Sequence, residues 1–176
     1  MDATFETQQL DQIAAMPGYQ SGYRLERIGD GRTCTLAFFS AGSRPGRYQV
    51  QADVPGEAAG RAGHAVAIGY FDGPLSAARL AAGRFGYEAR IAPALAGVPG
   101  LVRTLQLWQP TAAALCVVHV GVDLQALEAV GRTVNGTTLL PEEDPALLTG
   151  PDRFEIHRVL TGTRIDGPAR TEGARA

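Results

Sequence analysis

The sequence predicts an α+β protein built from a repeated unit of helix and antiparallel β-hairpin. Pro17-Gly18 and Pro99-Gly100 lie 82 residues apart (99 − 17), and Cys34 and Cys116 have the same separation (116 − 34). In both halves a helical pattern precedes the Pro-Gly pair, and two strand patterns joined by a turn follow it. A hydrophobic fraction of 45% and a charged fraction of 19% are ordinary for a folded domain with a buried core.

The first half has the pattern of a short helix followed by three strands. Leu10, Ile13 and Ala14 recur at helical spacing, and Pro17-Gly18 breaks the helix. Gly29-Asp30-Gly31 is a turn signal between two strand-like ranges, which predicts a hairpin. The expected elements are a helix over 4–15, strands over 19–28, 33–39 and 48–54, and a linker over 55–63.

The second half has the order β-α-β-β-α-β. The expected elements are a strand over 64–71, a helix from 77 to about 92 with Ser76 as N-cap, strands over 101–108 and 114–122, a helix after Asp123, and a strand over 154–160. That order is ferredoxin-like: an antiparallel sheet with both helices on one face. The apolar run over 115–118 suits a strand covered on both faces, so the free face needs a second sheet.

These patterns divide the chain into three parts. Residues 64–160 are predicted to form a complete βαββαβ module, and residues 1–55 a reduced module of helix, hairpin and strand. Residues 161–176 are polar and rich in Gly and Arg, which predicts a flexible tail. The second sheet that the complete module needs comes either from the first half of the chain or from another subunit.

Composition and motifs exclude several classes of function. The net charge of −2 gives no basic field for nucleic acid. No apolar run reaches the roughly 20 residues of a membrane span, and the polar start does not have the pattern of a signal peptide. The glycine-rich nucleotide motifs and the zinc motifs HExxH and CxxC are missing from the sequence. We therefore expect a cytoplasmic protein that binds neither nucleic acid nor membrane.

The two cysteines and three histidines admit a structural and a functional interpretation. Cys34 and Cys116 occupy equivalent strand positions, which fits either a redox or metal pair or two small core residues, and we interpret them as core residues. His64, His119 and His157 lie in or beside predicted strands. A metal site would need a third ligand converging on two of them, so we interpret them as separate side chains and expect no metal.

Polar side chains on the predicted strands are the candidates for a ligand site. Arg103 shares a strand face with leucines, so it either reaches a ligand anion or extends from a sheet edge into water. Trp108, on the opposite face with Gln106, either stacks on a planar substrate or packs at the end of the sheet. Tyr70 either orients a ligand or is a partly exposed strand residue. On the long helix, we expect Arg84, Tyr87 and Arg90 to form a solvated face.

Short motifs in the second half resemble a known family. Tyr70-Phe71-Asp72-Gly73-Pro74, the long helix, Val98-Pro99-Gly100, the hairpin and the Asp123 helix are similar to the antibiotic biosynthesis monooxygenase superfamily of dimeric α+β barrels. Its anthrone oxygenases, from aromatic polyketide pathways, look most similar. The resemblance covers about residues 64–160 and extends to 4–54, where the module lacks its first strand and second helix. It implies a fused dimer in which two antiparallel sheets face each other.

The sequence departs from this family at two positions of each module. Anthrone oxygenases of this group have an Asn and a Trp near the end of the second hairpin strand, where they hold the substrate. The matching positions fall near Leu36 and Ser40 in the first module. In the second module they fall near Val117 or Val118 and near Gly121 or Val122. No catalytic residue is therefore carried over from the family.

The resemblance implies a small monooxygenase-like protein that acts on an aromatic polyketide-type intermediate with dioxygen and without a metal. We expect no cofactor, with a flavin as the alternative. Such an enzyme deprotonates an electron-rich phenol or anthrone in an apolar pocket, and the carbanion reduces dioxygen. We assign His119 as the base and Arg103 as the donor to the oxyanion, with Tyr70 and Trp108 as substrate-binding residues.

Two other functions fit the same residues. One is a non-oxidative polyketide cyclase on the same fold, and the other is a non-catalytic protein that binds a ligand or a partner. The lack of the Asn and Trp pair favours these two, whereas polar groups on otherwise apolar strands favour an enzyme. A homodimer is the expected assembly if one chain does not complete the barrel.

Overall fold

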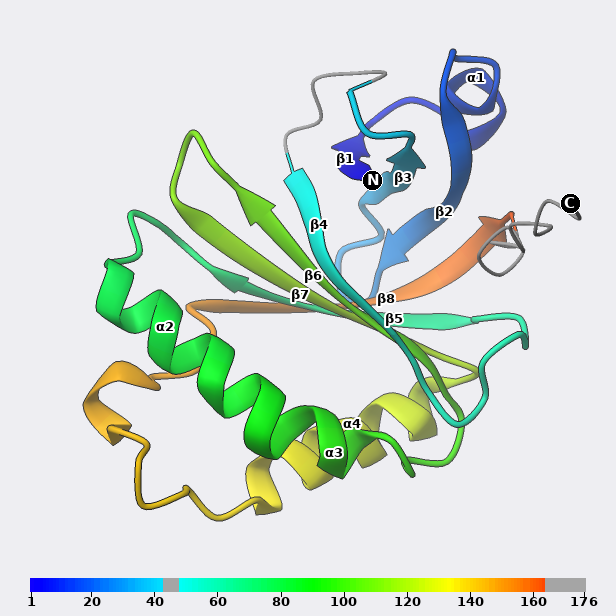
Figure 1. Ribbon diagram of the computed structural model, residues 1–176. Coiled ribbons are helices and arrows are strands. Elements are labelled where there is room, and N and C mark those ends of the chain that lie inside the picture. Colours follow the sequence, from blue (N-terminus) through cyan, green and yellow to red (C-terminus); the bar gives the residue numbers. More distant parts are fainter. Residues whose placement is uncertain (43–47, 164–176) are drawn as a thin grey trace, which may run out of the picture.

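Antiparallel strands from both halves of the chain pair edge to edge and close into one barrel (Figure 1). The computed structural model describes residues 1–42 and 48–163. Its strands are β1 (Asp2–Glu6), β2 (Tyr19–Arg27), β3 (Thr33–Phe39), β4 (Tyr48–Pro55), β5 (Ala65–Phe71), β6 (Leu101–Gln109), β7 (Ala114–Gly121) and β8 (Arg153–Gly162). Their order around the barrel is β1-β3-β2-β8-β5-β7-β6-β4, and β4 pairs with β1 to close the ring.

Each half of the barrel is a ferredoxin-like module with the same strand order. The order is β4-β1-β3-β2 in the first half and β8-β5-β7-β6 in the second. The modules join where β2 pairs with β8 and where β4 pairs with β6, and we call these two pairings the seams. The predicted fold class is confirmed: two antiparallel sheets face each other. One chain supplies both sheets, so the barrel closes without a second copy.

Strand pairing repeats with the 82-residue spacing of the sequence. Leu25 pairs with Cys34 between β2 and β3, and Leu107 pairs with Cys116 between β6 and β7. The irregularities in the two hairpins fall at equivalent positions, and so do those in the two seams. The glycines of both Pro-Gly pairs have φ of +77°, a conformation that glycine adopts without strain. The two hairpins are therefore the same local structure built twice.

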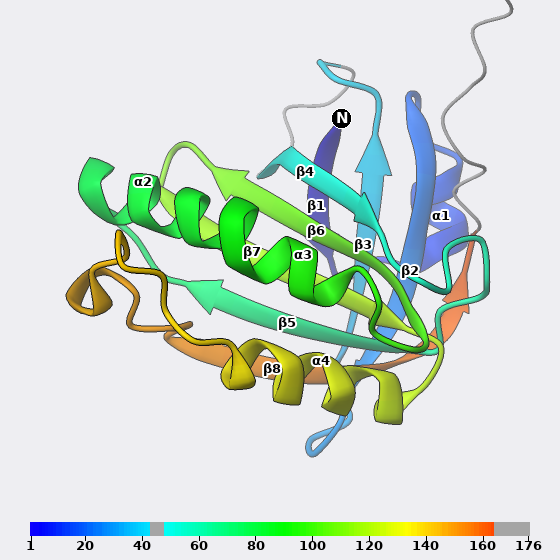
Figure 2. The same cartoon turned by 60° about the horizontal axis from the view of Figure 1, so that its bottom comes forward.

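Helices cover the outside of the barrel unequally (Figure 2). They are α1 (Leu10–Ala14), α2 (Ala77–Gly86), the π-helical turn η1 (Tyr87–Ile91), α3 (Ala92–Leu95), α4 (Leu124–Gly136) and the 3-10 turn η2 (Pro145–Leu147). A continuous rod of α2, η1 and α3 lies with α4 over the second module, whereas the first module has the short α1. The predicted caps are confirmed: Ser76 and Asp123 side chains accept backbone N–H groups at 3.2 and 2.8 Å.

The predicted helix over residues 4–15 is wrong in its first part. Residues 2–6 form β1, in which Ala3 and Phe5 face the barrel core. The alternation of this strand is short, and the helical spacing of Leu10 and Ile13 directly after it hides it in the sequence. The first module therefore has all four strands. Among the described residues, no helix lies between β3 and β4.

The end of the chain is only partly described. β8 continues to Gly162, so the first residues of the predicted tail over 161–176 belong to a strand. Residues 164–176, the rest of that predicted tail, lie outside the described residues. The predicted linker over 55–63 contributes Ala58 to the core, with 3% of its surface exposed.

Apolar side chains from all eight strands fill the barrel. Leu36, Phe38, Ile68, Leu105 and Val118 are fully buried there. Cys116 is fully buried in the same core and Cys34 packs against it, which agrees with their interpretation as core residues. Burial raises the pKa of both thiols, because the charged thiolate loses its hydration. The interior is thus a packed core.

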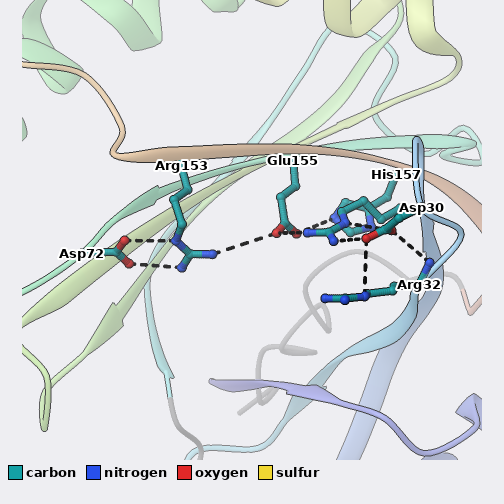
Figure 3. A network of polar contacts seen from close by, with 7 residues as sticks. Asp30, Arg32, Asp72, Arg153, Glu155 and His157 are labelled. Carbon is teal, nitrogen blue, oxygen red and sulfur yellow. Dashed lines mark hydrogen bonds and ion pairs between the residues drawn. The ribbon is translucent and has the colours of Figure 1, made fainter.

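Charged side chains form a connected network at the seam between β2 and β8 (Figure 3). The Arg27 guanidinium donates to the Glu155 carboxylate across the seam at 2.8 Å, and Glu155 also lies 3.2 Å from His157 Nε2. Arg153 donates to Asp72 at 3.0 Å and stacks 4.1 Å from the ring centroid of Tyr70. Because every charge has a partner of opposite sign, we interpret this network as part of the join between the modules.

The matched seams predict that the two modules unfold together. We expect Leu25→Ala, a truncation in the first module, to lower the free energy of unfolding by about 3 kcal/mol. The only tryptophan, Trp108, lies in the second module, so its fluorescence reports the other half of the barrel. The urea midpoint followed by Trp108 fluorescence should fall as far as the midpoint followed by circular dichroism. A fluorescence midpoint that stays at the wild-type value would contradict this prediction.

Candidate functional site

The structure divides the four predicted site residues between two faces of the second sheet. Trp108 and His119 lie on the outer face, toward the helices, because they alternate with core residues of β6 and β7. Arg103 and Tyr70 lie on the inner face, inside the barrel. The structure therefore brings Trp108 and His119 onto one surface. It does not bring Arg103 together with His119, because the sheet separates their side chains.

Three facing residue pairs form the outer surface of β6 and β7. The register places Thr104 opposite His119, Gln106 opposite Val117 and Trp108 opposite Leu115. We call these six residues the platform. All of them except the buried Thr104 are half-buried, although three are large apolar side chains. The platform thus combines an apolar surface with a polar pair at one end.

The polar pair at the end of the platform is a hydrogen bond between two side chains. Thr104 Oγ1 lies 3.0 Å from His119 Nδ1. Burial lowers the pKa of His119 to about 4, because the charged imidazolium is poorly solvated there. At neutral pH the ring is therefore neutral. When Nδ1–H donates to Thr104, Nε2 has a free lone pair and can accept a proton.

The helical rod forms a roof over this end of the platform. A hollow of about 10 Å³, room for about one water molecule, lies between rod and sheet. Tyr87 and Thr104 both line it, with apolar walls from Val54, Pro55, Ala92, Leu95, Ala96 and Leu101. The Tyr87 hydroxyl is buried and has no hydrogen-bond partner among the described residues. Its burial raises the pKa of Tyr87, so the phenol stays protonated and can donate.

The predicted solvated face over Arg84, Tyr87 and Arg90 is wrong for two of its three residues. Tyr87 and Arg90 are half-buried, and only Arg84 is exposed. The cause is the π-helical turn, which adds a residue to the helical repeat and rotates these side chains inward. The helix expected to end or kink near residue 92 continues as α3 to Leu95. Pro93 lies at the start of α3, directly after the π-helical turn that interrupts the regular α-helical hydrogen bonds.

The equivalent surface of the first module is closed. At a spacing of 82, Gly22 and Ala37 take the places of Thr104 and His119, and they face each other in the same register. A side chain at Gly22 would overlap Leu10 of α1, so the short helix packs directly on the strand. Arg24 takes the place of Gln106 and donates to Thr33, Thr35 and two backbone carbonyls. Only the second module therefore presents an open platform among the described residues.

The two inner residues have partners inside the barrel. The Arg103 guanidinium forms an ion pair with Asp53 across the seam between β4 and β6, and it lies 5.4 Å from the ring centroid of Phe38. Tyr70 packs against Phe5 and beneath Arg153. Burial raises the pKa of Tyr70 strongly, so its hydroxyl is neutral. The Arg103 ion pair was not predictable from the sequence, because Asp53 lies 50 residues away.

The described residues limit what else the site can hold. Within 1–42 and 48–163, no group of three or more His, Cys, Asp or Glu side chains could hold a metal ion. None of the helices in that part of the chain is long and apolar enough to cross a membrane. The platform offers a neutral imidazole and an apolar surface, and the roof adds the phenol of Tyr87.

Solved structures of several proteins resemble this one over most of both chains. LmHde, a heme-degrading enzyme from Listeria monocytogenes, has a TM-score of 0.60 and 14% identity, covering 89% of this chain and 97% of that one. A ferredoxin fold protein from Listeria monocytogenes 4b F2365, related to antibiotic biosynthesis monooxygenases, has a TM-score of 0.61 and 13% identity, covering 89% and 92%. An anthrone oxidase-like protein has a TM-score of 0.54 and 13% identity, covering 93% and 92%.

These likenesses define the class of fold. No protein-family model and no curated protein matches the sequence. The TM-scores show a shared fold. Sequence identities of 13% and 14% are too low to transfer an activity from these proteins to this one. The chain therefore has the ferredoxin-like α+β fold of proteins related to antibiotic biosynthesis monooxygenases.

Acid should destabilise the protein through His119. Its pKa is about 4 when folded and 6.5 when exposed, so the unfolded chain binds the proton first as pH falls. The contribution is fully present above pH 6.5, and roughly 3 kcal/mol of it is lost between pH 6.5 and 4. Urea unfolding at pH 7.5 and 4.5 measures this loss.

Two variants isolate that effect. His119→Gln should show a smaller loss of stability on acidification than the wild type, whatever its stability at pH 7.5. His64→Gln, at an exposed position outside the strands, should keep the wild-type loss. An undiminished pH dependence in His119→Gln would contradict the assignment of the lowered pKa to this side chain.

Proposed function

We propose that the chain is a small monooxygenase-like enzyme that oxidises a planar, ionisable aromatic substrate of polyketide type on the platform of its second module. The observation that carries this proposal is the platform itself, in which half-buried apolar side chains on β6 and β7 lead to the hydrogen-bonded His119–Thr104 pair. Thr104 lines the same hollow as Tyr87, whose buried hydroxyl has no hydrogen-bond partner among the described residues. In this proposal Trp108 and its neighbours hold the aromatic rings. His119 is the base, and Tyr87 is the donor to the developing oxyanion.

The position of the substrate follows from the size of the hollow. Room for about one water cannot hold a three-ring molecule, so the rings lie along Trp108, Leu115 and Val117 and only the reacting edge enters beneath Tyr87. The roof rod then moves outward as substrate enters. Closing it again removes water from the reacting atoms and strengthens the hydrogen bond from the phenol.

The substrate itself supplies the electrons for this reaction. His119 removes a proton from the activated CH₂ carbon of an anthrone, which leaves an enolate whose oxygen accepts from Tyr87. The enolate transfers electrons to dioxygen, a C–O bond forms, and the resulting peroxide takes up the proton. Loss of water from this peroxide breaks the O–O bond and the second C–H bond. The product is a quinone, so one oxygen atom enters it and the other leaves as water.

Two of the similar structures support a planar ligand. One is a heme-degrading enzyme and another is anthrone oxidase-like, and both heme and anthrone have flat ring systems. The platform offers a surface on which a flat ring system can stack, with Trp108 as its largest side chain. The inner residues Arg103 and Tyr70 contribute in this proposal by shaping the barrel behind the platform.

Oxygen consumption with anthrone or 1-naphthol, without added flavin, tests the proposal. We expect uptake above the rate of spontaneous oxidation, falling at least 10²-fold in His119→Gln because the base is lost. The rate should stay constant from pH 8 to about 5 and fall as pH approaches 4, because protonated His119 cannot accept a proton. His64→Gln is the matched control and should keep the wild-type rate.

The result that contradicts the oxygenase proposal is a lack of uptake with every planar phenol tested. Ring closure of a linear poly-β-ketone under nitrogen, with the same dependence on His119, would instead identify a non-oxidative cyclase.

The second candidate function is non-catalytic binding of a planar ligand or partner. The small hollow favours it, because a permanently closed roof would leave the outer part of the platform as a surface without a reaction site. Quenching of Trp108 fluorescence by a naphthol, with no turnover in air or nitrogen, would support this candidate over either enzyme.

A further inference from the structure

The buried apolar side chains that anchor the roof rod lie at its two ends. Leu75 is buried before α2, while Leu95 and Val98 are buried after η1 in a small cluster with Val130 of α4. Between these ends, the only buried residue of α2 is Gly86. The middle of the roof, which contains Tyr87, has weaker apolar anchoring. Ile91 packs against the small cluster while half-buried, and Arg79 of α2 donates to Thr149 at 2.6 Å in a solvent-exposed hydrogen bond.

An ion pair attaches the middle of the roof to the loop after α4. Arg90 of η1 donates to both carboxylate oxygens of Glu143, at 2.7, 2.9 and 3.1 Å. The same carboxylate accepts the backbone N–H of Leu140 at 2.7 Å, and Arg90 also donates to Thr137. The Glu143 side chain is 1% exposed and the Arg90 side chain 13% exposed. A buried carboxylate with this many donors has one well-defined position.

Gly86 allows the carboxylate to approach the helix. A Cβ atom at this position would overlap Glu143 Oε1, although the backbone of Gly86 is helical, with φ of −61°. Glycine disfavours a helix relative to alanine, so its presence here comes at a cost in helix stability. Gly83, three residues earlier in the same helix, has open space around it.

We propose that Glu143 and Arg90 are positioning residues, which hold the π-helical turn so that the Tyr87 hydroxyl stays over the polar end of the platform. This inference rests on the proposed function for the role of Tyr87. Arg90 and Tyr87 lie within the same five-residue turn, so fixing one sets the rotation of the other. Release of Glu143 frees the middle of the roof while Leu95 and Val98 keep its far end anchored.

Two glycine substitutions test the proposal against each other. Gly86→Ala fits the helical backbone and displaces only the Glu143 carboxylate, whereas Gly83→Ala makes no overlap. Hydrogen exchange without substrate should be at least tenfold faster for the amides of residues 87–91 in Gly86→Ala and unchanged or slower in Gly83→Ala. In turnover assays, kcat should fall at least tenfold in Gly86→Ala with a smaller change in KM, because Tyr87 is misplaced in the transition state.

Further variants keep the test decisive. Glu143→Gln should give the same exchange and kinetic changes as Gly86→Ala, and it serves alone if Gly86→Ala does not fold. Tyr87→Phe should lower kcat without faster exchange, which separates loss of the phenol from loss of its support. Wild-type exchange at residues 87–91 in both Gly86→Ala and Glu143→Gln would overturn the proposal. If no substrate turns over, the exchange result still decides the positioning role, and the proposed function fails separately.

Discussion

The edge-to-edge pairing of two ferredoxin-like sheets determines the rest of this structure. Each sheet has two edge strands whose backbone N–H and C=O groups would otherwise face water or another chain. The pairing of β2 with β8 and of β4 with β6 satisfies all four edges at once. Ion pairs cross both seams, from Arg27 to Glu155 and from Arg103 to Asp53. The enclosed space is filled by core side chains, which leaves the outer faces for chemistry.

The outer faces of the two modules are covered differently. In the first, Gly22 admits α1 onto the strand and Arg24 binds the neighbouring polar groups, so the surface is closed. In the second, the longer roof stands over Thr104, and the other platform residues, His119 among them, stay half-buried. A duplicated fold thus offers an internal comparison, because the same register carries a structural surface in one copy and a candidate site in the other.

Local patterns predicted the repeated architecture, and long-range contacts account for what they missed. The Pro-Gly spacing and strand alternation indicated both hairpins and the face shared by Trp108 and Gln106. The sequence does not predict the short β1, because a stronger helical pattern follows it directly. It also does not predict the burial of Tyr87, because a π-helical turn has no clear sequence signal. Asp53 and Glu143 lie 50 and 53 residues from their arginine partners, so only the folded chain brings these pairs together.

In the proposed function, a planar ligand binds the outer platform of the second module and leaves the closed counterpart in the first module empty. Amide and side-chain NMR shifts on titration with 1-naphthol compare the two surfaces in one experiment. We expect shifts at Trp108, Val117 and His119, with none at the equivalent Glu26, Thr35 and Ala37. Shifts confined to the barrel interior around Tyr70, or equal shifts on both modules, would contradict it.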